Sequence, residues 1–442
     1  MGGILADDMG LGKTVQVLSY LLAMKQNGQT LPSLIVCPAS LVLNWAEECQ
    51  KFTPELSCVV VDGDAAHRAE LAESWPAADL VVTSYDLLRR DEALYEGQEF
   101  YACILDEAQA IKNHTTQKYK AVCKVRSRVR FALTGTPVEN RLGELWSIFS
   151  FLMPGYLPPY KSFCSRFEKP IVQEEDQTAV RRLNQLTGPF ILRRMKSDVL
   201  KELPPKTENV YRIELEEEQR KLYLAAVVDA REKLQAAKPE DKMAVFAVLM
   251  RLREICCDPR LIADNWEGGS AKLDACAELV SSAVEGGHRI LLFSQFTSML
   301  ELLAKRLDAE GISHFTLQGS TPKPVRAELV RRFNGGEVSV FLISLRAGGT
   351  GLNLTAADIV IHYDPWWNVA AQNQATDRAY RIGQQNPVQV YKLIAQDTIE
   401  EKIVELQQAK QSLADTVTGT ADGAILSMRP DELLQLLEGS EP

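Results

Sequence analysis

A glycine-bearing loop that ends in Lys13 and Thr14 has the residue types of a phosphate-binding loop. A short apolar run precedes it and a helical pattern follows it. Gly10 and Gly12 let backbone N–H groups turn toward phosphate oxygens, and the start of a helix adds positive potential. We expect Lys13 to reach the β- and γ-phosphates of a nucleotide and Thr14 to bind Mg²⁺. The strict motif has glycine in place of Asp7, so a glycine-rich turn that only caps a helix is the alternative.

Two carboxylates, Asp106 and Glu107, follow a second apolar run, residues 102–105. Carboxylates at the end of a parallel strand lie at the sheet edge where α/β folds bind ligands. Asp106 would hold Mg²⁺, directly or through water, and Glu107 would orient and deprotonate an attacking water. A solvated acidic turn is the commoner origin of such a pair, but the presence of Lys13 upstream weakens that alternative.

Three further segments could act on the same nucleotide. Residues 133–137 (Leu-Thr-Gly-Thr-Pro) place small hydroxyl groups after a strand, where they sense a γ-phosphate or merely turn the chain. Arg378 and Arg381 are three residues apart, so on a helix they share one face, which either is solvated or stabilises a transferring phosphoryl group. Residues 344–354 form a second glycine-rich loop that permits close approach to a ligand or backbone.

The elements that must position these residues alternate between short apolar runs and amphipathic stretches. Such runs of four to eight residues are typical of buried parallel strands. The pattern occurs twice, which predicts two α/β lobes. The expected strands are residues 3–6, 34–37, 80–83, 102–105 and 130–133 in the first lobe, and 290–293, 314–317, 338–343, 359–362 and 388–393 in the second.

Residues 143–270, between the two sets of strands, differ in character. Prolines punctuate the first part, and residues 214–256 have the pattern of one long helix. We predict a helical insertion at about 143–190 and an interlobe bridge around 196–205. The expected division is an N-terminal lobe, a helical bridge or protrusion, a C-terminal lobe and a helical tail, over residues 1–200, 201–270, 271–395 and 396–442.

The composition excludes several classes of protein. The 442 residues are 46% hydrophobic and 24% charged, which are ordinary values for a globular chain. The longest apolar run, residues 243–250, is far shorter than the ~20 residues of a membrane span, so we expect no membrane partner. Nine cysteines without a C-x-x-C pair, and five scattered histidines, predict reduced thiols, a cytoplasmic location and no metal cluster built from these residues.

The charge balance does not decide whether the chain binds nucleic acid. The net charge is −10, from 49 basic and 59 acidic residues, so the protein is not basic overall. Phosphate contact needs only a local basic surface, which a total can hide. Residues 120–130 and 193–206 are basic stretches that could form such a surface.

The motifs occur in an order that resembles the Swi/Snf-type ATPases, a family of helicase-related translocases on double-stranded DNA. The resemblance covers residues 3–385 and includes residues 364–368 (Asp-Pro-Trp-Trp-Asn), whose tryptophans we expect mainly to pack. The family has aspartate at position 7, which accounts for the imperfect phosphate loop. Its Asp-Glu-Ala-Gln box, residues 106–109 here, sets it apart from many RNA helicases.

The resemblance implies an α/β fold of two RecA-like P-loop lobes, with ATP and Mg²⁺ as cofactors and double-stranded DNA bound through its phosphate backbone. It assigns catalysis to Glu107, Arg378 and Arg381, and Mg²⁺ binding to Thr14 and Asp106. The nucleotide-binding residues would be Gly10, Gly12, Lys13, Thr14, Asp106, Gly351 and Gln374. The DNA-binding residues would be Ser40, Thr83, Ser84, Gln318, Gly319, Ser320, Arg346, Gly348 and Thr350.

The function we expect is a DNA-dependent ATPase that couples hydrolysis to translocation on double-stranded DNA and remodels protein–DNA complexes. The family's upstream adenine-contacting element has no counterpart here, which indicates either a fragment or a misassigned start. The short stretch after the arginine motif favours a compact prokaryotic member of the family. We expect a monomeric motor, associated with the nucleoid if the protein is prokaryotic. The alternatives are a DNA-binding or regulatory module with impaired hydrolysis and a strand-separating helicase.

Overall fold

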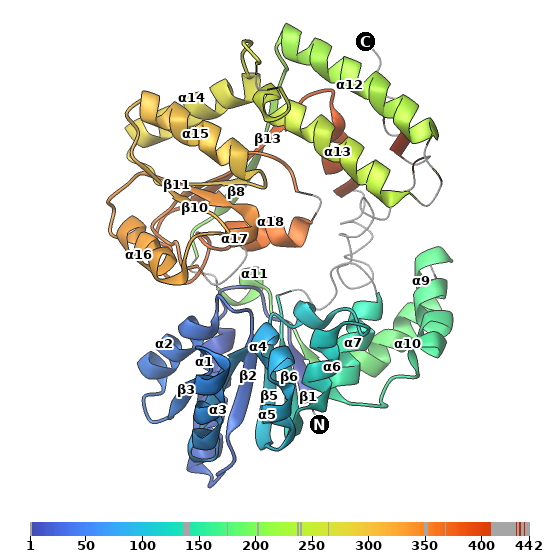
Figure 1. The fold of residues 1–442 in the computed structure, drawn as a ribbon, viewed down its shortest axis with the longest axis vertical. Coiled ribbons are helices and arrows are strands. Elements are labelled where there is room, and N and C mark those ends of the chain that lie inside the picture. The colour runs from blue at the N-terminus through green and yellow to red at the C-terminus, as the bar shows by residue number, and fades with distance from the viewer. Residues whose placement is uncertain are drawn as a thin grey trace. The chain divides into compact units, whose positions relative to one another are not determined.

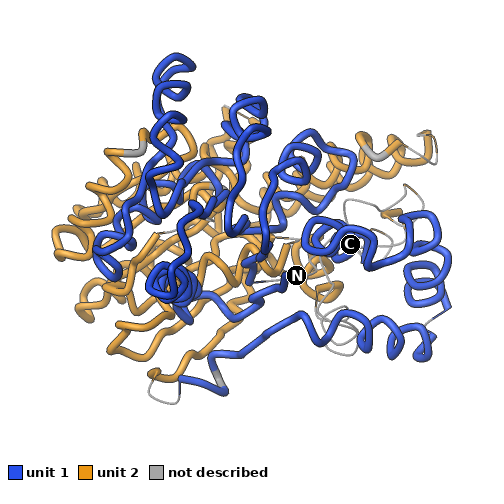
Figure 2. Tube along the Cα trace, turned by 90° about the horizontal axis from the view of Figure 1, so that it is seen from below, with its two compact units in different colours: residues 1–201, 417–420 blue, residues 202–416, 421–442 orange. Residues whose placement is uncertain are grey.

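The computed structural model describes residues 2–135, 142–174, 176–200, 203–236, 238, 241–263, 265–348, 352–366, 368–407, 430, 433, 434 and 437. The chain forms two compact units, one of residues 1–201 and one that begins at residue 202 (Figure 2). Each unit contains a sheet of parallel strands with helices packed against it (Figure 1). The predicted fold class, α/β with two parallel-sheet lobes, is confirmed.

The sheet of the first unit has seven strands in the order β3-β4-β2-β5-β6-β1-β7, and every paired strand is parallel. The strands are β1 (Gly2–Leu5), β2 (Ser33–Cys37), β3 (Cys58–Val60), β4 (Leu80–Ser84), β5 (Glu99–Asp106), β6 (Arg126–Leu133) and β7 (Ile191–Leu192).

The apolar runs become central strands because both faces of the sheet are covered. In β2, Leu34 and Val36 pack into one hydrophobic core, and Ile35 and Cys37 pack into the other. Successive side chains of a strand point to opposite faces, so a continuous apolar run fills two cores at once. The covering and inserted helices are α1 (Lys13–Gln26), α2 (Val42–Phe52), α3 (Ala65–Ser74), α4 (Tyr85–Arg90), α5 (Glu92–Glu96), α6 (Gln117–Lys124), α7 (Leu142–Leu152), α8 (Tyr160–Phe163), α9 (Lys169–Gln173), α10 (Gln177–Thr187) and α11 (Lys196–Val199).

The second unit contains a six-stranded parallel sheet in the order β10-β11-β9-β12-β13-β8. Its strands are β8 (Lys206–Ile213), β9 (Ile290–Ser294), β10 (His314–Leu317), β11 (Val340–Ser344), β12 (Ile359–His362) and β13 (Val388–Ala395). Its helices are α12 (Glu217–Ala236), α13 (Lys242–Cys257), α14 (Ala271–Glu285), α15 (Thr297–Ala309), α16 (Lys323–Asn334), α17 (Leu345–Gly348) and α18 (Val369–Thr376).

All ten strands expected from apolar runs are present, and three further strands were not expected. Of these, β3 and β7 are only three and two residues long. The third, β8, occupies the edge of the second sheet, and seven of its eight residues are exposed. An edge strand with polar exposed faces has no apolar run, so the helical character expected for residues 201–270 is wrong over Lys206–Ile213.

The single helix expected over residues 214–256 is also wrong, because the structure has two helices there, α12 and α13. Pro239 lies between them in the sequence, and proline disrupts a helix interior. Asp241 then starts the second helix, since its carboxylate accepts a hydrogen bond from the Ala244 N–H at 3.1 Å. The two helices pack together around buried apolar residues, among them Tyr223 and Leu249.

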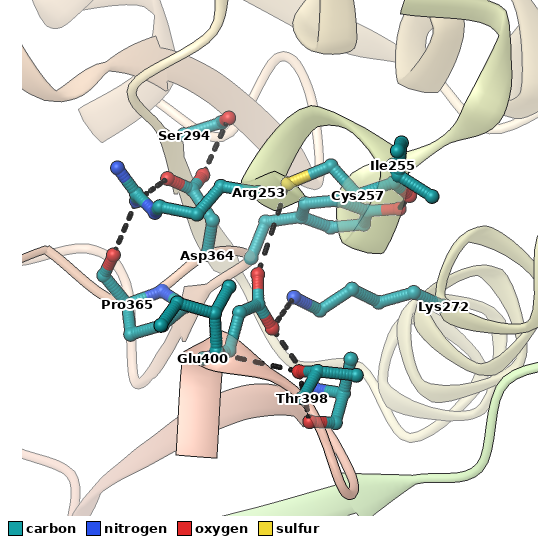
Figure 3. Close-up of polar contacts among 12 residues, drawn as sticks. Arg253, Ile255, Cys257, Lys272, Ser294, Asp364, Pro365, Thr398 and Glu400 are labelled. Carbon is teal, nitrogen blue, oxygen red and sulfur yellow. Dashed lines mark hydrogen bonds and ion pairs between the residues drawn. The ribbon is translucent and has the colours of Figure 1, made fainter. Parts of the chain in front are cut away.

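A network of buried polar side chains ties helices of the second unit to the ends of its strands (Figure 3). Lys272 of α14 and Glu400 are both fully buried, with 2.5 Å between Nζ and Oε2. Arg253 of α13 contacts Asp364 at 3.1 Å, and the same carboxylate accepts a hydrogen bond from the Ser294 hydroxyl at 2.7 Å. Asp364 belongs to the Asp-Pro-Trp-Trp-Asn motif, so the network fixes that motif to α13 and β9.

The tail and the domain bounds are only partly described. Residues 399–407 are helical, Leu433 and Leu437 are buried, and the remainder of the expected tail helices lies outside the described residues. In the described part of the chain, no helix combines the length and apolar character needed to cross a membrane. The expected bounds at 200, 270 and 395 stay a prediction.

Candidate nucleotide and nucleic-acid site

The sheet order of the first unit brings three motifs to one edge. β6 pairs with β1 on one side and with β5 on the other, with Leu133 opposite both Leu5 and Asp106. Because these strands are parallel, the segments after their carboxyl ends emerge side by side. The phosphate loop, the Asp106–Glu107 pair and Thr134 therefore lie at the same edge, as the sequence predicts.

The phosphate loop adopts the backbone conformation that its glycines permit. Gly10 has φ 87° and Gly12 has φ 74°, in the left-handed region that other residues seldom occupy. Lys13 begins α1 directly after Gly12, and Thr14 is in the first turn of that helix. The loop and the helix N-terminus thus form the arrangement that binds phosphate in other proteins.

The Lys13 ammonium group lies on the carbonyl oxygens of its own loop. Nζ donates to the Asp7 oxygen at 2.6 Å and is 3.3 Å from the Asp8 oxygen. Burial lowers the pKa of Lys13, and the carboxylates of Glu107 and Asp106 act in the opposite direction. A partly desolvated cation held by neutral carbonyls can exchange these partners for phosphate oxygens, so the donor set fits a nucleotide.

Asp106 is held by two aromatic residues that sequence reasoning did not identify. Trp45 of α2 donates from Nε1 to the Asp106 carboxylate at 2.8 Å, and the Tyr85 hydroxyl donates to the Asp106 backbone oxygen at 2.8 Å. Burial, and next the charge of Glu107, raise the pKa of Asp106 to about 7. A carboxylate poised in this way becomes fully ionised when a cation binds, which fits the expected Mg²⁺ ligand.

Glu107 is fixed by its backbone and by its neighbours. Its φ of 50° is unusual for a residue with a side chain and indicates local strain, a feature that clusters at functional sites. Gln109 donates from Nε2 to the Glu107 carboxylate at 2.7 Å, and the Thr134 hydroxyl donates to Gln109 Oε1 at 3.1 Å. Thr134 is therefore linked to the candidate catalytic carboxylate through one side chain. Thr136 lies outside the described residues.

The proposed DNA-contacting residues of the first unit lie at the carboxyl ends of two adjacent strands: Ser40 follows β2, and Thr83 and Ser84 end β4. Ser40 is half-buried. Thr83 is fully buried and accepts a hydrogen bond from the Tyr95 hydroxyl at 3.0 Å, and Ser84 caps α4 by accepting from the Leu87 N–H. Ser40 is thus the one of the three whose side chain is partly accessible, and the role of all three stays a prediction.

The basic stretch at residues 120–130 is at the opposite end of the same strands. Arg126 and Arg128 are at the start of β6, whereas the motifs follow its end. Arg128 pairs with Glu99, and Lys124 pairs with Glu92, so much of this positive charge is balanced locally. A role of this stretch in DNA binding stays a prediction.

In the second unit, the residues expected to contact DNA follow β10 and β11, which pair with each other. Gln318, Gly319 and Ser320 come directly after β10, and the Gln318 N–H donates to the Thr321 hydroxyl at 3.0 Å. The backbone of Arg346 and Gly348 belongs to α17, which follows β11. Thr350 and Gly351 lie outside the described residues.

The helical face expected to carry Arg378 and Arg381 is not formed. Helix α18 contains Gln374 but ends at Thr376, and both arginines are in the turn that follows. Arg378 is only 1% exposed, while Arg381 is half-buried and donates from Nη1 to the Leu352 carbonyl at 3.4 Å.

The buried Gln384 amide stabilises that turn. Its Nε2 bonds to the Ala357 carbonyl at 2.7 Å and to the Ala379 carbonyl at 3.1 Å. The bond to Ala379 satisfies a carbonyl group in the turn itself, and the bond to Ala357 ties the turn to the segment before β12. Of the two tryptophans expected to pack, Trp366 is half-buried against apolar clusters, and Trp367 lies outside the described residues.

Metal binding in this site would depend on few protein ligands. Among the residues that the structure describes, no group of three or more His, Cys, Asp or Glu side chains could hold a metal ion. Mg²⁺ is usually bound by one or two protein oxygens together with substrate phosphates. Thr14 and Asp106 are the oxygens the first unit offers, and their role as ligands is a proposal.

The parallel-sheet lobes and the phosphate loop define a protein of the α/β P-loop class. A family model described as the SNF2-related domain matches residues 1–261, and one described as the helicase conserved C-terminal domain matches residues 271–383. The chain belongs to the SNF2-related family.

Curated relatives carry names of the same kind. An uncharacterized ATP-dependent helicase of Mycoplasma pneumoniae is 41% identical, over 99% of this chain and 42% of its own length. The putative ATP-dependent helicase/translocase YwqA of Bacillus subtilis is 40% identical, over 98% of this chain and 48% of its own length. The chain therefore spans less than half the length of these relatives.

A solved structure extends the comparison. The Sulfolobus solfataricus SWI2/SNF2 ATPase core, solved in complex with double-stranded DNA, is 35% identical to this chain. The match covers 98% of this chain and 90% of the archaeal one, with a TM-score of 0.47.

Proposed function

We propose that the chain hydrolyses ATP in response to double-stranded DNA, translocates along the duplex and remodels protein–DNA complexes. The observation that carries the proposal is the convergence of Lys13, Asp106 and Glu107 at one edge of the first sheet. Family membership and the names of the relatives support it, as does the duplex bound to the archaeal ATPase core.

The residues of the first unit divide the work of hydrolysis. Lys13 exchanges its carbonyl partners for phosphate oxygens, and the glycine backbone of the loop donates N–H groups to the same phosphates. Bound Mg²⁺ would neutralise charge on the phosphate oxygens, held by Thr14 and Asp106. Glu107 accepts the proton of the attacking water, while Gln109 keeps its carboxylate oriented.

The residues of the second unit would contribute positive charge at the nucleotide and contacts to DNA phosphates. Arg378 and Arg381 would stabilise the transferring phosphoryl group, and the partly accessible Arg381 is the better candidate. Hydroxyl, backbone and arginine groups after β2, β4, β10 and β11 would hold DNA phosphates. Contacts of this kind give weak sequence preference and strong dependence on salt.

Two substitutions test the hydrolytic assignment. Lys13→Ala and Glu107→Gln should lower DNA-stimulated ATP turnover by at least ~100-fold, because each removes a group needed for phosphate binding or proton transfer. Glu99→Gln is the matched control, since Glu99 begins the same strand, β5, and is exposed. Turnover that stays at the parental level in either variant would refute the proposal.

The same assays separate the alternatives. Substantial ATP turnover by the parental chain would exclude the alternative that the chain is a DNA-binding module that does not hydrolyse ATP. A displacement assay on forked DNA distinguishes translocation from strand separation, because a duplex translocase consumes ATP without releasing a strand.

A further inference from the structure

The first residues of the phosphate loop are held by a segment almost 190 residues further along the chain. The Ala6 N–H donates to the Leu192 carbonyl at 2.7 Å, and the Asp8 N–H donates to the Arg194 carbonyl at 3.0 Å. The Lys196 N–H in turn donates to the Asp8 carboxylate at 3.0 Å. These bonds continue the pairing of β1 with β7 past the end of both strands and along the loop.

Side chains reinforce this pairing at one position. The Asp7 carboxylate is fully buried and accepts hydrogen bonds from the Arg194 backbone N–H and from its Nε, each at 3.0 Å. The Arg194 Nη2 also bonds to the same carboxylate and, at 2.5 Å, to Gln16 Oε1. Gln16 then donates to the Leu11 carbonyl at 3.0 Å. One guanidinium group therefore braces both the start of the loop and the helix that follows it.

The chemistry explains why arginine and aspartate suit these positions. A buried carboxylate is costly unless a cation and hydrogen bonds compensate it, and the planar fork of arginine matches a carboxylate with two parallel bonds. Asp7 also supplies the carbonyl oxygen that holds the Lys13 ammonium group at 2.6 Å. Fixing Asp7 therefore fixes the group that orients the phosphate-binding lysine.

We propose that Arg194 is a positioning residue that sets nucleotide affinity by holding Asp7 and the phosphate loop in place. The inference rests on the proposed binding of ATP by this loop. The inference extends that function, because residues 191–200, which hold the loop, lead directly into the second unit at residue 202. Nucleotide binding and the order of residues 191–200 are then coupled, and each stabilises the other by the same amount.

The first experiment compares Arg194→Gln with Arg193→Gln. The two arginines are adjacent, but Arg193 is exposed, so its variant controls for loss of charge. A fluorescent ATP analogue should bind Arg194→Gln about 10-fold more weakly, with KM for ATP rising in parallel and kcat within about threefold. Measured without DNA, because Arg193 belongs to a basic stretch that could contact nucleic acid, Arg193→Gln should keep its affinity for the ATP analogue within about twofold. A purely structural role would reduce the active fraction, and hence kcat, at constant KM. Parental affinity in folded Arg194→Gln would overturn the inference.

The second experiment needs no nucleotide. Amide hydrogen exchange of residues 6–16 in the nucleotide-free protein should be faster in Arg194→Gln than in the parent or in Arg193→Gln. If the parent binds no ATP but the exchange rates differ as expected, the proposed function fails and the bracing role stands. Equal exchange rates in all three proteins would overturn the bracing role itself.

A double variant keeps the test valid if the single one folds poorly. Arg194→Gln alone leaves a buried carboxylate without its cation, whereas Asp7→Asn combined with Arg194→Gln removes both charges. The double variant should melt close to the parent and still bind the ATP analogue about 10-fold more weakly. Parental affinity in the folded double variant would show that the loop does not need this pair.

Discussion

The Asp106 carboxylate opposes the stability of the first unit. Its pKa is raised to about 7, whereas an unfolded aspartate titrates near 3.8. The folded state therefore binds this proton more tightly than the unfolded state does. The contribution of this proton to the stability of the first unit is therefore fully present below the unfolded-state pKa of 3.8 and is lost as pH rises through the folded-state pKa of about 7. A residue suited to binding a cation thus weakens the metal-free fold at neutral and higher pH.

Replacing the Asp106 carboxylate should restore the stability that the metal-free first unit loses at high pH. In EDTA at pH 8, Asp106→Asn should stabilise the first unit by up to about 4 kcal/mol, because asparagine accepts the Trp45 bond without charge. At pH 5 the advantage should fall to roughly 1–2 kcal/mol, because the folded carboxyl group is protonated there while the unfolded one is still ionised, and it should vanish only below about pH 3.8.

Thermal unfolding at the two pH values measures this effect. Asp79→Asn is the control with opposite sign, because the Asp79 pKa is lowered by Lys25 and Ser57 against the effect of burial. Equal melting temperatures of Asp106→Asn and the parent at pH 8 would contradict the prediction.

At the scale of elements, the Lys272–Glu400 pair joins α14 to the helix at residues 399–407 (Figure 3). Lys272→Met and Glu400→Gln should each destabilise the second unit by about 3–5 kcal/mol, because each leaves a buried charge without its partner. The double variant should lose less than the sum of the two.

Urea unfolding of the four proteins measures this coupling. The exposed pair of Lys221 and Glu217 in α12 provides a matched comparison, and its removal should leave the urea midpoint almost unchanged because exposed ion pairs contribute little. Additive losses at Lys272 and Glu400 would mean that the pair is not a unit.

The sequence predicted those elements whose side chains are buried on both faces. β2 and β9 are buried along their whole length and apolar at all but one residue each, whereas β8 is exposed along most of its length, so nothing in its composition marked it as a strand. The candidate site likewise contains residues with a local sequence signal and residues without one. Lys13 and Glu107 were found from residue type and spacing, whereas Trp45 reaches Asp106 only because the sheet order brings α2 beside β5. Contacts of this kind depend on topology and have no local sequence signal.

Across the whole molecule, the two units should respond to acid in opposite directions. His362 in the second unit is buried, and burial lowers its pKa to about 3. A folded pKa below the unfolded value of 6.5 means that stability is lost as pH falls below 6.5. Asp106 in the first unit gains stability over the same range.

Calorimetry between pH 7.5 and 5.5 tests this contrast. The transition of the first unit should gain about 1–2 kcal/mol and that of the second should lose a similar amount. Asp106→Asn should remove the gain and leave the loss. Two transitions that shift together in the parent would contradict the assignment.

The position of β1 in its sheet has a consequence for biosynthesis. β1 carries the phosphate loop, yet its two neighbours are β6 and β7, which end at Leu133 and Leu192. At roughly 5–20 residues per second, the ribosome needs about 10–40 s to pass from the loop to the second of these neighbours. During that interval at least one side of β1 lacks its neighbouring strand, so the sheet edge that carries Lys13 is incomplete. On the proposed function, the loop should become competent only when the first unit is complete, and a chain released before that point should not consume ATP.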